Sequence, residues 1–174
     1  MDHLREKILD GENALEKLMR KIPGFEGYKS REQSRNADQL QRKFMARSIG
    51  EAKSRLGDAG QEMMRSGNIM LIGEVDRVSK LLDKVADRIE HAEYGYSSLF
   101  ASVKIDTQEL DQIYEYDLTM VNSIESISEA ILGLEGSLDM EEGNPKARLR
   151  DVEKAVKNLD RMIDGRQKLL KGVE

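Results

Sequence analysis

Apolar residues recur along most of this chain at alternating steps of four and three positions, and the longest such run lies between Ile113 and Leu138. The run consists of Ile113, Asp117, Met120, Ile124, Ile127, Ile131, Leu134 and Leu138. This is the a/d heptad pattern of a helix whose side chains insert between those of partner helices. Asp106, with Glu109 three residues later, has the spacing of a capping box. The pattern therefore predicts a long helix after Asp106, with the carboxylic acid Asp117 at a core position.

Four more segments show helical periodicity, and turn residues separate them. Pro23-Gly24 interrupts the pattern after the first segment, Ser66-Gly67-Asn68 follows the second, and Gly143-Asn144-Pro145 precedes the last. Proline lacks a backbone donor and glycine adopts turn conformations, so both mark the ends of helices. In the last segment the pattern is lost at Gly165-Arg166, which predicts fraying of the final turns. We expect these four helices over residues 2–21, from 30 to between 56 and 65, over 69–93, and from 145 onward.

Five helices joined by short connectors predict an all-α fold, an antiparallel up-and-down helical bundle with long coiled-coil-like helices. The composition agrees, because 35% of the 174 residues are charged, 39% are hydrophobic and only two are proline. The length suits a single domain over residues 1–174, with the C-terminal few residues frayed. The second and fourth helices carry more apolar surface than a short first helix can cover. We therefore expect self-association, in the form of a homodimer.

The composition also limits where the protein acts and which chemistry it can use. The absence of cysteine excludes disulfides, thiolate metal sites and cysteine nucleophiles. No apolar run approaches the roughly 18 residues that a membrane-spanning helix needs. The first residues, Met-Asp-His-Leu-Arg-Glu, contain no apolar signal core. These features predict a cytoplasmic protein.

The connector after the first helix is unusual because it contains two aromatic residues and an isoleucine. It reads Ile22-Pro23-Gly24-Phe25-Glu26-Gly27-Tyr28 and is followed by a helix rich in Lys, Arg and Glu. A second aromatic junction, Tyr94-Gly95-Tyr96-Ser97, follows the third helix. Together these segments resemble a group of uncharacterised prokaryotic coiled-coil proteins. The resemblance covers the middle of the chain and implies no activity.

An up-and-down topology brings the first-to-second and third-to-fourth junctions to the same end of the bundle, which we call the aromatic pole. Aromatic and basic residues suit a pocket or a surface that recognises a protein partner. The same aromatic residues also suit a plug that seals the bundle, with tyrosine hydroxyls facing water. Both interpretations stay open at this point. The candidate residues of the pole are Phe25, Tyr28, Arg31, Arg35, His91, Tyr94, Tyr96, Phe100, Tyr114 and Asp117.

Asp117 needs a partner if it lies in the core. An ionised carboxylate without a cation or water there carries a desolvation cost of several kcal/mol. The predicted topology brings Arg31 and Arg35 to the same end, and arginine can bind a carboxylate through two parallel hydrogen bonds. We expect Asp117 to contact Arg31 or Arg35, which would tie the second helix to the fourth and determine their register.

Basic residues gather in one part of an otherwise acidic chain. The formal net charge is −5, yet between Lys17 and Arg55 there are eleven Lys and Arg against four Asp and Glu. Arg31, Arg35 and Arg42 fall near one face of the predicted second helix, a stripe suited to phosphates of an anionic membrane surface or of nucleic acid. Acidic residues interrupt the stripe and no aromatic residues alternate with it, so nucleic acid is disfavoured. Pairing with acidic residues of the bundle or of a second chain is a simpler explanation of the basic stripe.

Motifs of known enzymes are missing. The two histidines, His3 and His91, cannot supply the paired Glu-x-x-His motifs of a di-iron bundle, and there is no Gly-x-x-x-x-Gly-Lys or Gly-x-Ser-x-Gly. We expect a non-enzymatic interaction or scaffold protein without metal or cofactor, which self-associates and presents the aromatic pole to a protein partner. The alternative is a peripheral membrane-associated coiled-coil protein that binds anionic surfaces through the basic second helix. The least favoured hypothesis is an enzyme that uses Tyr, Asp, Arg and His91 at the pole.

Overall fold

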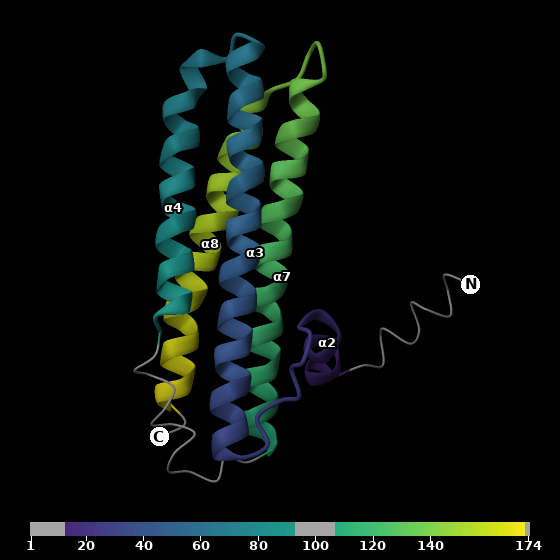
Figure 1. Ribbon diagram of the computed structural model, residues 1–174, viewed down its shortest axis with the longest axis vertical. Helices are drawn as coiled ribbons and strands as arrows, with labels where there is room; N and C mark the ends of the chain where they lie inside the picture. Colours follow the sequence, from purple (N-terminus) through teal and green to yellow (C-terminus); the bar gives the residue numbers. More distant parts are fainter. Residues whose placement is uncertain (1–12, 93–106, 173–174) are drawn as a thin grey trace, which may run out of the picture.

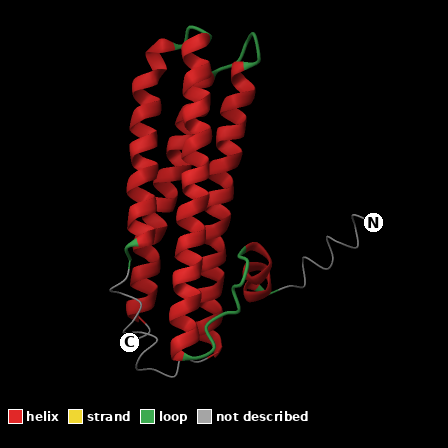
Figure 2. Ribbon diagram, in the orientation of Figure 1, coloured by secondary structure: helices red, strands yellow, loops and turns green. Residues whose placement is uncertain are grey.

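The computed structural model describes residues 13–92 and 107–172, and these residues are helical apart from short loops (Figure 2). No strand occurs within these two ranges, which confirms the all-α prediction. The third predicted helix begins with a single 3-10 turn before its α-helical part. The elements are α2 (Ala14–Lys21), α3 (Arg31–Arg65), the 3-10 turn η1 (Ile69–Leu71), α4 (Ile72–Glu90), α7 (Thr107–Leu138) and α8 (Pro145–Gly172).

Four of the helices form an antiparallel bundle in which successive helices run in opposite directions (Figure 1). Helix α3 packs against α4 and α7, and α8 packs against the same two helices from the other side. Helices α3 and α8 therefore lie diagonally opposite each other. The short helix α2 packs on α7 outside this square (Figure 1). The up-and-down topology is thus as predicted, but in the described part of the chain the first helix is an eight-residue side element.

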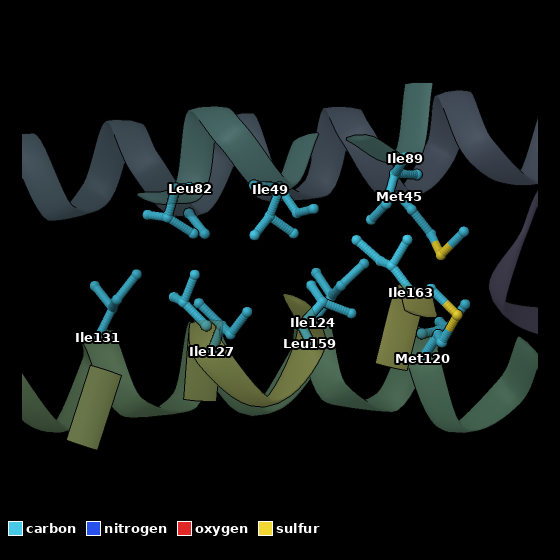
Figure 3. Packing of buried hydrophobic residues seen from close by; sticks show 14 of the residues in the cluster. Met45, Ile49, Leu82, Ile89, Met120, Ile124, Ile127, Ile131, Leu159 and Ile163 are labelled. Atoms are coloured by element: carbon cyan, nitrogen blue, oxygen red, sulfur yellow. The ribbon is translucent and has the colours of Figure 1, made fainter. Parts of the chain in front are cut away.

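The core follows the predicted heptad runs. Side chains of α3 and α4 point toward those of α7 and α8, and residues from all four helices fill the space between them (Figure 3). On α7 the buried positions include Ile113, Met120, Ile124, Ile127, Ile131 and Leu134, each at most 3% exposed. Burying one such side chain stabilises the fold by about 1.5 to 3 kcal/mol. The alternating steps of four and three therefore identify the residues that hold the bundle together.

Polar residues begin the helices, at Ser30 and Asn144 as the sequence indicated and at Asn13 within the helix predicted over residues 2–21. Asn13 and Glu16 form a capping box at the start of α2, with the Asn13 Oδ1 accepting from the Glu16 N–H at 2.9 Å. Ser30 caps α3, and the Asn144 Oδ1 accepts from the Ala147 N–H at 3.0 Å beside Pro145, the first residue of α8. The capping role expected for Asp106 lies outside the described residues.

The C-terminal helix differs from the expectation. Helix α8 continues through Gly165-Arg166 to Gly172, and Arg166 and Leu170 are each only 2% exposed. Gly165 is required by a close contact, because a Cβ atom there would lie 2.0 Å from the Tyr116 hydroxyl. That hydroxyl donates a hydrogen bond to the Met162 carbonyl at 3.0 Å. The apparent loss of pattern is therefore the place where α8 packs against α7 through a glycine and a buried arginine.

Candidate functional site

Three aromatic side chains of the pole are buried against one another. Phe25, Tyr28 and Tyr114 are 2%, 6% and 3% exposed. The rings of Tyr28 and Tyr114 stack with centroids 5.3 Å apart, and Phe25 meets Tyr28 edge-on at 5.7 Å. The Tyr28 backbone N–H donates to the Tyr114 hydroxyl at 2.7 Å. These contacts support a plug for all three residues, since none of them offers a surface to a partner. The expectation that the tyrosine hydroxyls face water is wrong for Tyr28 and Tyr114, because their hydroxyls are buried and hydrogen-bonded.

Gly27 explains why the connector approaches α7 so closely. Its φ is +85°, a conformation that favours glycine, and an added Cβ would lie 2.7 Å from the Tyr114 hydroxyl and 2.9 Å from Leu15. Only a residue without a side chain fits between the connector, α2 and α7. The second glycine of the Ile-Pro-Gly-Phe-x-Gly-Tyr segment is thus a packing requirement.

Asp117 is completely buried, and its cation is Arg166 of α8. The Arg166 Nε donates to one carboxylate oxygen of Asp117 in a short contact, and Nη2 donates to the other at 3.1 Å. Two parallel hydrogen bonds of this kind are the strong geometry for an arginine and a carboxylate. The predicted contact with Arg35 is therefore wrong, because Arg35 is exposed whereas Asp117 is buried. The side chain of Arg31, the other predicted partner, lies outside the described residues.

A second carboxylate completes what we call the charged cluster: Asp38, Arg42, Asp117 and Arg166. Asp38 is 3% exposed and accepts from the Arg166 Nη2 at 3.3 Å and from the Arg42 Nε at 2.8 Å. Arg42 also donates to the backbone carbonyl of Glu90 at 2.7 Å. The cluster joins α3, α4, α7 and α8 with two positive and two negative charges. This balance offsets the cost of removing charged groups from water.

Tyr28 and Gln41 extend the charged cluster. The Tyr28 hydroxyl lies 2.6 Å from both an Asp117 oxygen and the Gln41 Oε1, but it has one proton, which the charged acceptor Asp117 attracts more strongly. The buried Gln41 Nε2 has no hydrogen-bond partner. Rotating this amide by half a turn directs Nε2 to the Tyr28 oxygen as a donor and removes the conflict. Burial, and then the Asp117 charge, raise the pKa of Tyr28 well above its ordinary value.

The remaining predicted site residues are not part of this arrangement. His91 is exposed, and its Nδ1 lies 3.1 Å from the Asp87 carbonyl in the last turn of α4. Tyr94, Tyr96 and Phe100 lie outside the described residues. Sequence reasoning missed the roles of Asp38, Gln41, Arg42 and Arg166. A signal for Arg166 was present, because Leu159, Ile163, Arg166 and Leu170 keep the steps of four, three and four.

A second feature is a groove between α3 and α7, next to the end of α2. Its volume is about 210 Å³. Glu125 forms one edge of the groove and pairs with Lys21, the last residue of α2, at 2.5 Å, so α2 ends where the groove begins. Phe44 of α3 also lines the groove. The lining residues are Phe44, Ser48, Glu51, Ala52, Arg55, Val121, Ile124, Glu125 and Ser128.

Neither feature has the donor set of a metal centre. Within residues 13–92 and 107–172, no three His, Cys, Asp or Glu side chains are grouped so that they could hold a metal ion. No helix in these ranges is long and apolar enough to cross a membrane. Comparison of the chain with protein-family models, curated proteins and solved structures found no match.

Proposed function

We propose that this protein is a non-enzymatic scaffold that works as a homodimer, with two copies joined through the groove between α3 and α7. The single observation that carries the proposal is an exposed leucine on the same face as the groove. Leu132 is 59% exposed. It lies one helical turn after Ser128, which lines the groove. A large exposed apolar side chain next to a hollow with apolar residues in its wall, here Phe44, Val121 and Ile124, is a common mark of an interaction surface.

Helix α7 has a second face, beside its core-facing one, on which the apolar residues Val121 and Leu132 alternate with polar residues. Val121, Glu125, Ser128 and Leu132 follow steps of four, three and four, so they share one face. Helix α2 and its connector cover the start of this face, where Tyr28 stacks on Tyr114 and Lys21 pairs with Glu125. The rest of this face extends past the end of α2. This supports the prediction that the short first helix leaves apolar surface on the second and fourth helices uncovered.

The groove and Leu132 are arranged so that two copies can complement each other. Leu132 lies eight residues beyond Ile124, or about 12 Å along the helix. A two-fold axis perpendicular to α7 at Ser128 would bring the Leu132 of each copy level with the Ile124 of the other. A cavity of roughly 150 Å³ holds a benzene molecule, so a groove of about 210 Å³ has room for a leucine side chain. Such a contact uses the same surface twice and closes at two copies.

The proposed partner of the pole is a second protein that would contact its rim. Because Phe25, Tyr28 and Tyr114 are buried, the described residues available for this contact are Arg35 and His91, which are exposed. The groove is the better-supported surface, because it combines a hollow with a matching side chain.

The test is to change Leu132 and measure the molar mass by light scattering after size exclusion. We expect the unchanged protein to be a dimer and Leu132→Glu to be a monomer. Burial of two leucines contributes about 3 to 6 kcal/mol, so their loss should raise the dimer Kd by about 10² to 10⁴-fold. The matched control is Met70→Glu, which changes another exposed apolar residue far from the groove and should leave the dimer intact. An unchanged protein that is monomeric at every concentration, or a dimeric Leu132→Glu, would overturn the proposal.

A further inference from the structure

The outer face of α8 carries a line of cations, which we call the α8 ridge. Its members follow one another at steps of four, four, three, four, seven and three, so they share one face of the helix. All of them are exposed, and the line is about 37 Å long at 1.5 Å per residue. The ridge consists of Lys146, Arg150, Lys154, Lys157, Arg161, Lys168 and Lys171.

The ridge points away from the bundle. The opposite side of α8 is the core side, with Leu149, Val152, Val156, Leu159 and Ile163 all at most 2% exposed. Helix α8 lies behind α3 in Figure 1, diagonally across the bundle. The groove between α3 and α7 is therefore on a different side of the molecule, and a partner on the ridge would leave it free.

Most cations of the ridge keep their charge available, because three of the four acidic residues of α8 pair with cations of α4, and the fourth, Asp151, pairs with Arg148 of α8 at 3.7 Å. Glu153 pairs with Arg77 at 2.8 Å, and Asp160 pairs with Lys84 and Arg88, all of which belong to α4. Asp164, which is exposed and lies on the ridge face between Arg161 and Lys168, pairs with Arg88 at 2.5 Å. In the part of the chain that the structure describes, Lys157 is the one member of the ridge that makes an ion pair, with Glu153 at 2.7 Å. A chain with a net charge of −5 thus has one strongly positive side.

We propose that the α8 ridge is a docking surface for an anionic lipid bilayer. A straight line of cations can contact a flat layer of headgroups along its whole length, and each basic residue adds to the attraction. The ridge contains no apolar or aromatic residue, so the protein would lie on the surface without insertion. The attraction is electrostatic and should fall as the salt concentration rises.

Nucleic acid fits the same ridge less well. Each strand of a duplex crosses a line parallel to its axis once per turn of about 34 Å. A ridge about 37 Å long would therefore meet only a few phosphates. A single strand would find no aromatic side chain among the ridge residues on which to stack its bases. The shape and the composition of the ridge therefore both favour a flat anionic bilayer over nucleic acid.

The ridge is a second candidate positive surface, beside the basic second helix. On α3, Arg42 belongs to the charged cluster. The exposed cations Arg35, Lys43 and Arg47 remain there. Because α3 and α8 are diagonally opposed, the two helices cannot both lie on one flat surface. Removing the same number of cations from α3 is therefore a matched control for removing them from the α8 ridge.

The experiment is co-sedimentation of the full chain with vesicles of phosphatidylcholine alone or mixed with phosphatidylserine. We expect binding only to the mixed vesicles, and weaker binding at higher salt. The variant Arg150→Gln/Lys154→Gln/Arg161→Gln should lower the affinity for mixed vesicles by about 100-fold. The control Arg35→Gln/Lys43→Gln/Arg47→Gln removes the same charge from α3 and should change it by less than about threefold. All six positions are exposed, so both variants should keep the helical circular dichroism of the unchanged protein.

Three results would overturn the proposal. The first is no binding to mixed vesicles at low salt. The second is a loss of affinity in the α3 variant as large as that in the α8 variant, which would assign the effect to net charge or to α3. The third is tighter binding to duplex DNA than to mixed vesicles at the same salt, which would assign the ridge to nucleic acid. Repeating the measurement with Leu132→Glu, which keeps every residue of the ridge, separates the outcome from that of the dimer test.

Discussion

The two ends of the bundle are built in different ways. At the aromatic pole, Phe25, Tyr28 and Tyr114 are buried above a charged cluster whose carboxylates are at most 3% exposed. At the opposite end, α3 turns into α4 and α7 into α8 (Figure 1). Large apolar side chains at that end are exposed to solvent. Met64, Ile69, Met70 and Met140 are exposed there by 52%, 65%, 93% and 68%.

The difference lies in where each end finds its stabilising contacts. The opposite end depends on local features, such as the positive φ of Gly67 and the Asn68 N–H that donates to the Met63 carbonyl at 2.8 Å. At the pole, each polar group depends on groups from other helices, as Asp117 of α7 depends on Arg166 of α8 and on Tyr28 of the connector. Comparable substitutions should therefore cost more at the pole than at the opposite end.

The largest effect should come from removing the cation of the charged cluster. Arg166→Met leaves Asp117 and Asp38 buried without the arginine that they share, which should lower the free energy of unfolding by about 3 to 5 kcal/mol. Asp38 keeps its ion pair with Arg42, so Asp117 is the carboxylate left without a cation. Adding Asp117→Asn removes that charge, so the double variant should be more stable than Arg166→Met alone. The measurement is urea unfolding followed by circular dichroism.

Arg161→Met is the matched control for this prediction, because Arg161 lies on the exposed face of the same helix. It should change the free energy of unfolding by less than about 0.5 kcal/mol. If Arg166→Met and Arg161→Met have equal effects, the charged cluster does not stabilise the pole.

A pair of glycines sharpens the comparison between the two ends. Gly27 and Gly67 have nearly the same φ, +85° and +83°, but a Cβ at Gly27 meets Tyr114 and Leu15 whereas nothing lies within 4 Å of one at Gly67. Gly67→Ala should cost about 1 kcal/mol, the strain of a left-handed alanine. Gly27→Ala adds a clash in a packed region and should cost about 1 to 3 kcal/mol more. Thermal unfolding of both variants gives the difference, and equal losses would mean that the connector can move away from α7.

The smallest effect should come from the exposed methionine at the opposite end. Met70→Gln replaces a side chain that is 93% exposed and should change stability by less than about 0.5 kcal/mol in either direction. A loss above about 1 kcal/mol in calorimetry would show that Met70 is covered in solution. That end would then also be a contact surface.

Much of the fold could be predicted from the sequence because heptad spacing is a local property. The run from Ile113 to Leu138 identified the buried face of α7, and Ser30 and Asn144 marked the starts of α3 and α8. The same reasoning placed Phe25, Tyr28, Tyr114 and Asp117 at one end of the bundle, which the structure confirms. Each of these predictions depends on the periodicity of a single helix and on the alternation of helix directions.

The sequence by itself thus determined the helices, their turns and the presence of a carboxylate at a core position. Only the tertiary structure decided that the cation for Asp117 is Arg166, 49 residues away on α8. Arginine at a core position resembles a break in the pattern when only one helix is considered, since its burial is favourable only beside the carboxylates of α3 and α7. Gly27 and Gly165 are similar, because the side chains that exclude a Cβ there come from α7. Periodicity describes what one helix buries, whereas pairing depends on how helices distant in sequence rotate and slide against one another.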